Sequence, residues 1–178
     1  MHVKKSWVAL SLAAVTLTSC SPGRTLDETA GGPSTVAAVT ASPGQTVTFG
    51  QWISYGKGIK VTVRTDGFQT VSPYAEGSTG SSAAVFEIDV SNASTADFDP
   101  AQMSKLSVTY GAEDTKASQV IDAPAGATTG PLGPIGPGKS ETIRLTFAIP
   151  PGTRTNVHVQ VPGPTAGDPP AVFTGFIE

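Results

Sequence analysis

Ala84-Val85-Phe86-Glu87-Ile88-Asp89-Val90-Ser91 is the stretch that decides the fold class of this chain. Apolar side chains at positions 84, 86, 88 and 90 alternate with Glu87, Asp89 and Ser91. A period of two residues is typical of a strand with one face in a core and the other toward water. The turn residues Asn92-Ala93-Ser94 follow and end the pattern. The stretch therefore predicts a half-buried β-strand.

The same alternation recurs on both sides of this strand. The chain holds 20 glycines and 15 prolines but only 14% charged residues, a mix that favours short strands joined by turns. We expect Asp66-Gly67 to be one such turn, followed by irregular chain as far as Gly80. The other strands are expected at 46–49, 59–63, 106–110, 120–121, 143–149, 157–161 and 172–177.

Strand number and turn spacing together predict the architecture. Seven or eight short strands, with no sustained helical spacing after Cys20, indicate an all-β fold. The prediction is an immunoglobulin-like antiparallel β-sandwich, with a small closed barrel as the alternative. Because Cys20 is the only cysteine, no disulfide can form within the chain, and the core must hold the domain together.

The N-terminus has the features of a bacterial secretion signal in the expected order. Lys4 and Lys5 precede the uncharged, mostly apolar run 7–17, which is too short for a membrane-spanning helix of about 20 residues. Leu17-Thr18-Ser19-Cys20 resembles the lipobox of bacterial lipoproteins. That resemblance implies cleavage between Ser19 and Cys20 and acyl chains, palmitate among them, attached through the Cys20 sulfur. An ordinary signal peptide with a chance cysteine is the alternative.

Three regions follow from these patterns. Residues 1–19 are predicted to be the signal peptide, and residues 20–45 the lipidated cysteine with a flexible tether rich in Ser, Thr, Pro and Gly. Residues 46–178 are predicted to form the sandwich domain. The net charge is −3, and cleavage would remove two lysines from a chain with no basic cluster. Nucleic acid is therefore not expected as a partner.

Searches for catalytic and metal motifs favour non-catalytic interpretations. Ser54-Tyr55-Gly56-Lys57 matches the S-x-x-K string of penicillin-binding enzymes, but flanking glycines favour a hairpin turn. His158 would be the one histidine left after cleavage, and its strand phase points it outward, which favours a surface residue over a catalytic base. Zinc lacks the usual ligands. We predict no enzymatic activity and no cofactor.

Two further groups of residues are candidate binding sites. Loop acids could hold calcium, but none has the spacing of a known calcium loop, and solvated acids are favoured; they are Glu76, Asp97, Asp99, Glu113 and Asp114. Aromatic residues near irregular backbone either pack strand ends or form a recognition surface. This second group is Trp52, Tyr55, Phe68 and Tyr74, of which Trp52, Tyr55 and Tyr74 are the candidate ligand-binding residues.

The order of several short motifs is similar to a known group of bacterial proteins. Val47-Thr48-Phe49-Gly50 leads to Gly58-Ile59-Lys60-Val61-Thr62-Val63, then to the stretch around Phe86, and later to Gly136-Pro137-Gly138-Lys139. Over Thr46 to about Val161 the chain resembles the DUF4352 (telokin-like) group, mainly actinobacterial, and the MPT63-like immunogenic proteins. The resemblance implies an immunoglobulin-like sandwich outside the membrane. It supplies no catalytic residues.

The functional hypothesis is a non-enzymatic binding or interaction module. It would be held by the lipid on Cys20 at the extracytoplasmic face of the bacterial cell membrane. Its partner would be an envelope protein or a small molecule, which the sequence does not identify. The alternatives are a passive surface antigen or structural spacer, and an envelope enzyme or accessory subunit using His158 and a loop carboxylate.

Overall fold

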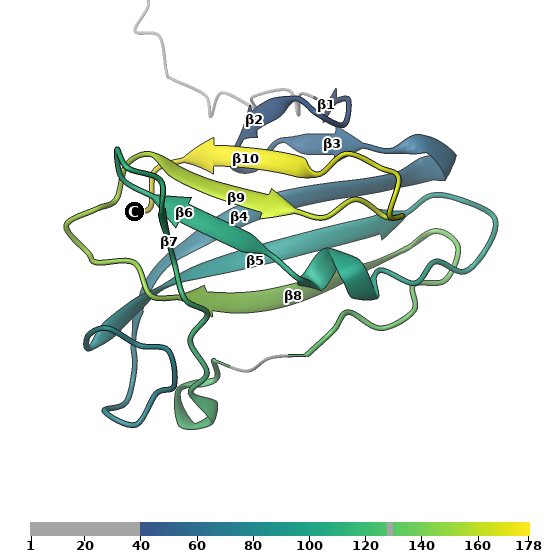
Figure 1. The fold of residues 1–178 in the computed structure, drawn as a ribbon. Coiled ribbons are helices and arrows are strands. Elements are labelled where there is room, and N and C mark those ends of the chain that lie inside the picture. Colours follow the sequence, from purple (N-terminus) through teal and green to yellow (C-terminus); the bar gives the residue numbers. More distant parts are fainter. Residues whose placement is uncertain (1–39, 128–129) are drawn as a thin grey trace, which may run out of the picture. The chain divides into compact units, whose positions relative to one another are not determined.

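The computed structural model describes residues 40–127 and 130–178 (Figure 1). The predicted signal peptide, Cys20 and most of the predicted tether lie outside these residues. In the described part the chain forms two five-stranded sheets. The first has the order β1 (Thr40–Ala41), β3 (Trp52–Ser54), β4 (Ile59–Thr70), β5 (Ser82–Asn92) and β8 (Lys139–Phe147). The second has the order β2 (Thr46–Thr48), β10 (Ala171–Gly175), β9 (Val157–Val161), β6 (Ser107–Tyr110) and β7 (Thr115–Lys116).

The strand that decides the fold class lies where the sequence predicts it. β5 pairs antiparallel with β4 on one side and with β8 on the other. Phe86 is completely buried, and its ring lies 5.9 Å from Phe49 and 6.0 Å from Phe147, between ring centroids. Both sheets contribute side chains to one apolar core cluster, including Val159 and Phe173 from the second sheet. The all-β sandwich is therefore confirmed.

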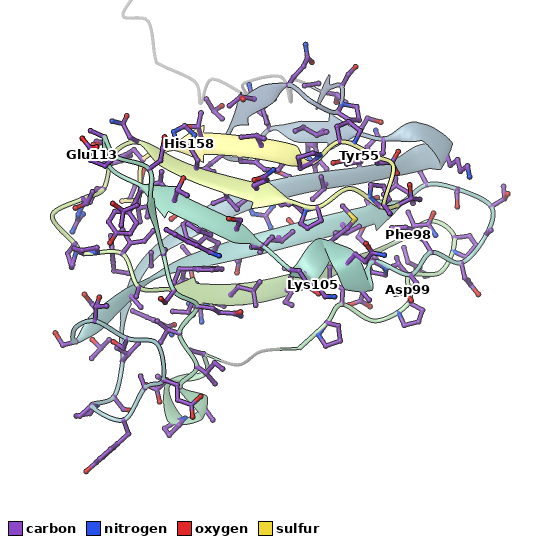
Figure 2. All side chains as sticks on the ribbon, viewed as in Figure 1. Tyr55, Phe98, Asp99, Lys105, Glu113 and His158 are labelled. Carbon is purple, nitrogen blue, oxygen red and sulfur yellow. The ribbon has the colours of Figure 1, made fainter. Side chains whose placement is uncertain are left out.

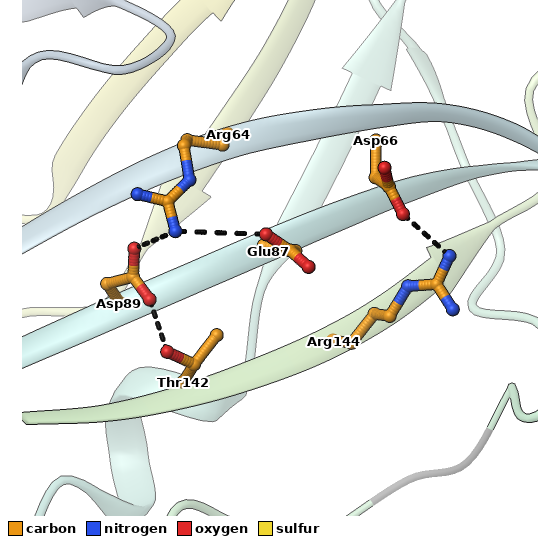
Figure 3. Close-up of polar contacts among 6 residues, drawn as sticks. All are labelled: Arg64, Asp66, Glu87, Asp89, Thr142 and Arg144. Carbon is orange, nitrogen blue, oxygen red and sulfur yellow. Dashed lines mark hydrogen bonds and ion pairs between the residues drawn. The ribbon is translucent and has the colours of Figure 1, made fainter.

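The outer face of the first sheet carries a network of charged side chains (Figure 3). Arg64 lies 2.5 Å from Asp89 and 3.8 Å from Glu87. Thr142 donates a hydrogen bond to the other oxygen of Asp89. Asp89 was predicted to face outward, and it does, but these neighbours cover it to 8% exposure. The network satisfies a carboxylate that burial would otherwise destabilise.

The expected turn at Asp66-Gly67 is wrong. β4 continues through these residues to Thr70, and its register against β5 shifts between Thr65 and Phe68. Gly67 has φ 71°, so the positive φ that the turn signal indicated is used inside a β-bulge. The bulge places the Asp66 carboxylate 2.8 Å from Arg144 of β8.

Two strand pairings are parallel, although the sequence predicted only antiparallel ones. β1 pairs with β3, and β2 pairs with β10. Consecutive strands β1, β2 and β3 alternate between the two sheets, so no hairpin fixes their relative direction. Pairing also starts at Thr40, ahead of the expected start at Thr46. The described residues form ten strands, more than the expected seven or eight, because β1, β3 and β7 have only two or three residues each and are too short to show alternation.

Residues 120–121 were expected to form a short strand. Instead the Val120 amide donates a hydrogen bond to the Thr146 carbonyl, and Ile121 makes an isolated bridge with Glu76. Val120 joins a small second cluster with Val71, Ala83 and Ala148 on the outer side of the first sheet. The buried Asp122 carboxylate anchors this segment by accepting hydrogen bonds from the amide and hydroxyl of Ser72.

Candidate functional site

A cleft of about 410 Å³ opens among the loops at one end of the sandwich. This is the end where β4 begins and β5 ends, as the pairing of Ile59 with Asn92 shows. Figure 2 marks it by Tyr55 and Phe98 and places Glu113 toward the opposite end. We call it the loop-end cleft. It is lined by Tyr55, Gly56, Lys57, Ile59, Ser94, Ala96, Asp97, Phe98, Pro164, Thr165 and Asp168.

The first wall is the 3-10 turn η1 (Gly56–Gly58). Lys57 has φ 62°, a left-handed conformation that is uncommon outside glycine. At Gly58 an added Cβ would lie 2.9 Å from the carbonyl carbon of Ala93, so only glycine allows this close approach. The Gly58 carbonyl accepts a hydrogen bond from the Ala93 amide at 2.9 Å. The turn is thus tied to the next wall.

The second wall is the chain that follows β5, and the side chain of Asn92 organises it. Asn92 is fully buried. Its Nδ2 donates to the carbonyls of Ala96 and Ile135, both at 2.8 Å, and its Oδ1 accepts from the Ser94 amide at 2.9 Å. Phe98 and Ile135 also exchange two backbone hydrogen bonds. This wall is therefore held by hydrogen bonds to the distant segment at Ile135, of which the Asn92 bond is buried.

The third wall is the loop between β9 and β10. Oδ2 of Asp168 accepts hydrogen bonds from the Thr165 amide at 3.0 Å and the Thr165 hydroxyl at 2.7 Å. Gly163 packs so closely on this loop that an added Cβ would lie 2.6 Å from the Cβ of Asp168. The Tyr55 hydroxyl donates to the Pro169 carbonyl at 3.0 Å and joins the third wall to the first. The three walls form one preorganised site.

The pKa of the Tyr55 hydroxyl depends on its position between the first and third walls. Burial, and next the negative charge of Asp168, raise the pKa of Tyr55 to about 12. In the unfolded chain a tyrosine ionises near pH 10, so the folded state binds the proton more tightly than the unfolded state. The contribution of Tyr55 to the free energy of unfolding should be fully present below about pH 10 and fall by about 2 kcal/mol as the pH rises toward about 12.

Urea titrations across this pH range measure the effect. Tyr55→Phe should lack this loss of stability because it has no ionisable hydroxyl. Tyr74→Phe should retain it because the Tyr74 side chain is 91% exposed. If the free energy of unfolding of Tyr55→Phe still fell between about pH 10 and about pH 12, a group other than Tyr55 would cause the loss of stability.

Three charged side chains without an ion-pair partner in the described residues line the cleft. They are Lys57, Asp97 and Asp168. On the other side of the β9–β10 loop lies a second hollow of about 330 Å³, which Thr165 and Asp168 also line together with Lys105. Such a site can bind a ligand that carries both apolar surface and charge.

The structure separates the three predicted aromatic candidates. Tyr55 lies in the cleft. Trp52 is half-buried on the outer face of the first sheet, beside Lys60 and Ser91. Tyr74 lies in the loop after Thr70, at the end of β4 opposite the cleft. They do not form one surface.

The other predicted sites also fall in different places. His158 lies between buried Val157 and Val159, half-exposed on the outer side of the second sheet, as its strand phase predicts. Ser54-Tyr55-Gly56-Lys57 spans the end of β3 and η1 rather than a helix start. Within residues 40–127 and 130–178, no three His, Cys, Asp or Glu side chains lie close enough together to hold a metal ion.

The sequence did not indicate that most of the residues forming the cleft walls belong to a site. Asn92 looked like a turn residue only, and Thr165 and Asp168 stood in a stretch expected to be simple loop. Asp97 was considered, but as a calcium ligand. A local signal exists only for Asn92, an amide at the last position of a buried strand. The others are brought in by tertiary contacts.

Comparisons with known proteins show the fold. The chain matches no protein-family model, and a search of curated proteins found no match. It is similar to the solved structure of the yjhA protein from Bacillus subtilis, with 14% identity, a TM-score of 0.56, and coverage of 72% of this chain and 98% of that one. A secreted protein from Mycobacterium tuberculosis, MPT63, matches with 12% identity and a TM-score of 0.49, over 74% of this chain and 97% of that one.

A third match is an uncharacterised β-sandwich protein from Clostridium difficile, with 18% identity, a TM-score of 0.47, and coverage of 73% of this chain and 93% of that one. The similarity to the yjhA structure, at a TM-score of 0.56, shows a shared fold. The assignment to the DUF4352 group stays a prediction. No helix in the described residues has the length and apolar character needed to cross a membrane.

Proposed function

We propose that this protein is a lipid-anchored binding module of the bacterial cell envelope, without enzymatic activity, that binds its partner in the loop-end cleft. The observation that carries the binding role is the construction of the cleft. Three loops from distant parts of the chain are tied together by hydrogen bonds, the one from Asn92 to Ile135 fully buried, around a space of about 410 Å³. A sandwich that served only as a spacer would not need such a site.

The anchoring part of the proposal rests on the N-terminal sequence. The charged start, the apolar run and Leu17-Thr18-Ser19-Cys20 together support export and acylation at Cys20. Two or more acyl chains give stable attachment to a membrane, whereas one gives only marginal attachment. The domain would then display the cleft outside the cell membrane.

Replacing Cys20 with alanine should abolish acylation, because the cysteine sulfur is the acceptor. The variant is expected to lose the mass of the acyl chains and to remain as uncleaved precursor. Mass spectrometry of the membrane fraction measures both changes. Wild-type protein with an unmodified Cys20 would contradict the anchoring proposal. Ser21→Ala is the neighbouring control and should be acylated normally.

Blocking the cleft tests the binding role. The exposed Ala96 side chain lines the cleft, so Ala96→Trp should fill it without disturbing the core. Ala112, exposed in the turn between β6 and β7, offers the matched control Ala112→Trp. The full-length protein should capture a saturable partner from envelope extract, and only Ala96→Trp should lose it. Equal capture by both variants would place binding elsewhere, and no saturable partner would favour a passive spacer.

A further inference from the structure

The chemistry of the loop-end cleft favours one class of ligand group. We propose that the cleft binds an organic cation, either an alkylammonium or a guanidinium group, between the carboxylates of Asp97 and Asp168 and the rings of Tyr55 and Phe98. This rests on the proposed function, since it names the ligand chemistry of the same cleft.

The two carboxylates have unused capacity to accept hydrogen bonds. Oδ2 of Asp168 accepts from Thr165, which fixes the carboxylate in place. Within the described residues, Oδ1 of Asp168 and both oxygens of Asp97 have no hydrogen-bond or ion-pair partner. Carboxylates in that state bind N–H donors of a cation through charge-assisted hydrogen bonds, which are stronger than neutral ones.

The two aromatic rings add a second kind of attraction. Tyr55 is buried and Phe98 is half-buried, and both line the cleft. The Tyr55 hydroxyl is occupied by the Pro169 carbonyl and the residue is only 4% exposed, so Phe98 offers the larger ring surface to a ligand. Ring faces attract organic cations, and this attraction grows when water is excluded. Rings and carboxylates thus select the same ligand group.

Of the residues that the structure describes, Lys57 is the one positively charged residue that lines the cleft beside the carboxylates of Asp97 and Asp168. Its exposed side chain lines the cleft, so the three charged groups sum to −1. A single cation, or a cation with an acidic group nearby, fits this balance better than a dication or an anion. Replacing Lys57 also tests whether the ligand is positively or negatively charged. Its removal should strengthen the binding of a simple amine and would weaken the binding of an anion.

The cation could belong to a peptide side chain or to a free amine. Calorimetric titration of the full-length protein with Nα-acetyl-lysine amide and with n-butylamine compares these two sources. Tighter binding of the lysine derivative would assign the ligand to a peptide, and equal binding would assign it to a free amine. Nα-acetyl-norleucine amide, which has no ammonium group, should bind at least about tenfold more weakly than the lysine derivative.

Three charge variants complete the experiment. Asp97→Asn and Asp168→Asn should each weaken binding of Nα-acetyl-lysine amide about threefold, and Asn at 168 can still accept from Thr165. Lys57→Gln should strengthen binding about twofold. Glu113→Gln removes one negative charge at the opposite end of the sandwich and should change nothing. Higher salt should weaken binding to the wild type.

Phe98→Leu keeps apolar volume but removes the ring, and should weaken binding about threefold. Absence of lysine-derivative binding, equal binding of the norleucine analogue, or weaker binding in Lys57→Gln would each overturn the inference. If Ala96→Trp still abolished capture of the envelope partner under those outcomes, the cleft would remain a binding site for another ligand class. Failure of both experiments would remove the proposed function as well.

Discussion

Replacing Phe86 with alanine should lower the free energy of unfolding by about 4 kcal/mol. Phe86 is completely buried at the centre of β5, and its ring contacts the rings of Phe49 and Phe147. The substitution removes a large apolar side chain and leaves a cavity that two sheets held by hydrogen bonds cannot easily fill. Phe147→Ala should have a similar effect, of about 3 to 5 kcal/mol.

The matched controls lie on the outer face of the same strands. Glu87 follows Phe86 directly and lies 3.8 Å from Arg64 in a partly exposed pair. Arg144 pairs with Asp66 at an exposed position. Glu87→Ala and Arg144→Ala should each cost less than about 1 kcal/mol. Urea denaturation of the full-length protein measures all four variants. Equal losses of unfolding free energy on the two faces would contradict the assignment of Phe86 and Phe147 to the buried face.

Replacing Asn92 with alanine should cost about 3 kcal/mol, the largest effect we expect from a polar residue. The side chain is fully buried and makes three hydrogen bonds, to Ala96, Ile135 and Ser94. Its removal leaves buried backbone groups short of a partner and opens a small cavity, and both effects destabilise the folded state. The cleft wall after β5 should also loosen.

Hydrogen exchange measures that loosening. The amides of Ser94 and Phe98 should exchange faster in Asn92→Ala, because the loop that holds them loses its buried anchor. Ser91→Ala is the matched control, since Ser91 is the neighbouring residue on the outer face of β5 and is only half-buried. It should leave stability and exchange nearly unchanged. Unaltered exchange at Ser94 in Asn92→Ala would show that the wall does not depend on this side chain.

The strands were predictable from the sequence because their signal is local. The alternation around Phe86 reports burial within a few residues, and the same holds for the strand at Val157 to Val161. The Asp66-Gly67 bulge was misread because a positive φ serves a turn and a bulge equally well. Thr40–Ala41 was missed because a two-residue parallel strand has no periodicity to detect.

The cleft was less predictable because its walls meet only in three dimensions. Tyr55 was selected as an aromatic residue near irregular backbone, but its partner Pro169 lies 114 residues away. Thr165 and Asp168 acquire their role from the position of their loop beside Tyr55. The burial of Asp89 was missed for the same reason, since strand phase identifies a face but not the side chains that cover it.

Photo-crosslinking in living cells tests the central claim most directly. A photo-reactive amino acid is placed at position 96, which lines the loop-end cleft, or at position 112, in the turn between β6 and β7. The full-length protein is expressed in its own envelope and irradiated, and its mass is then measured. We expect a discrete adduct from position 96 and none from position 112. An adduct from position 112 alone, or none from either position, would contradict the account.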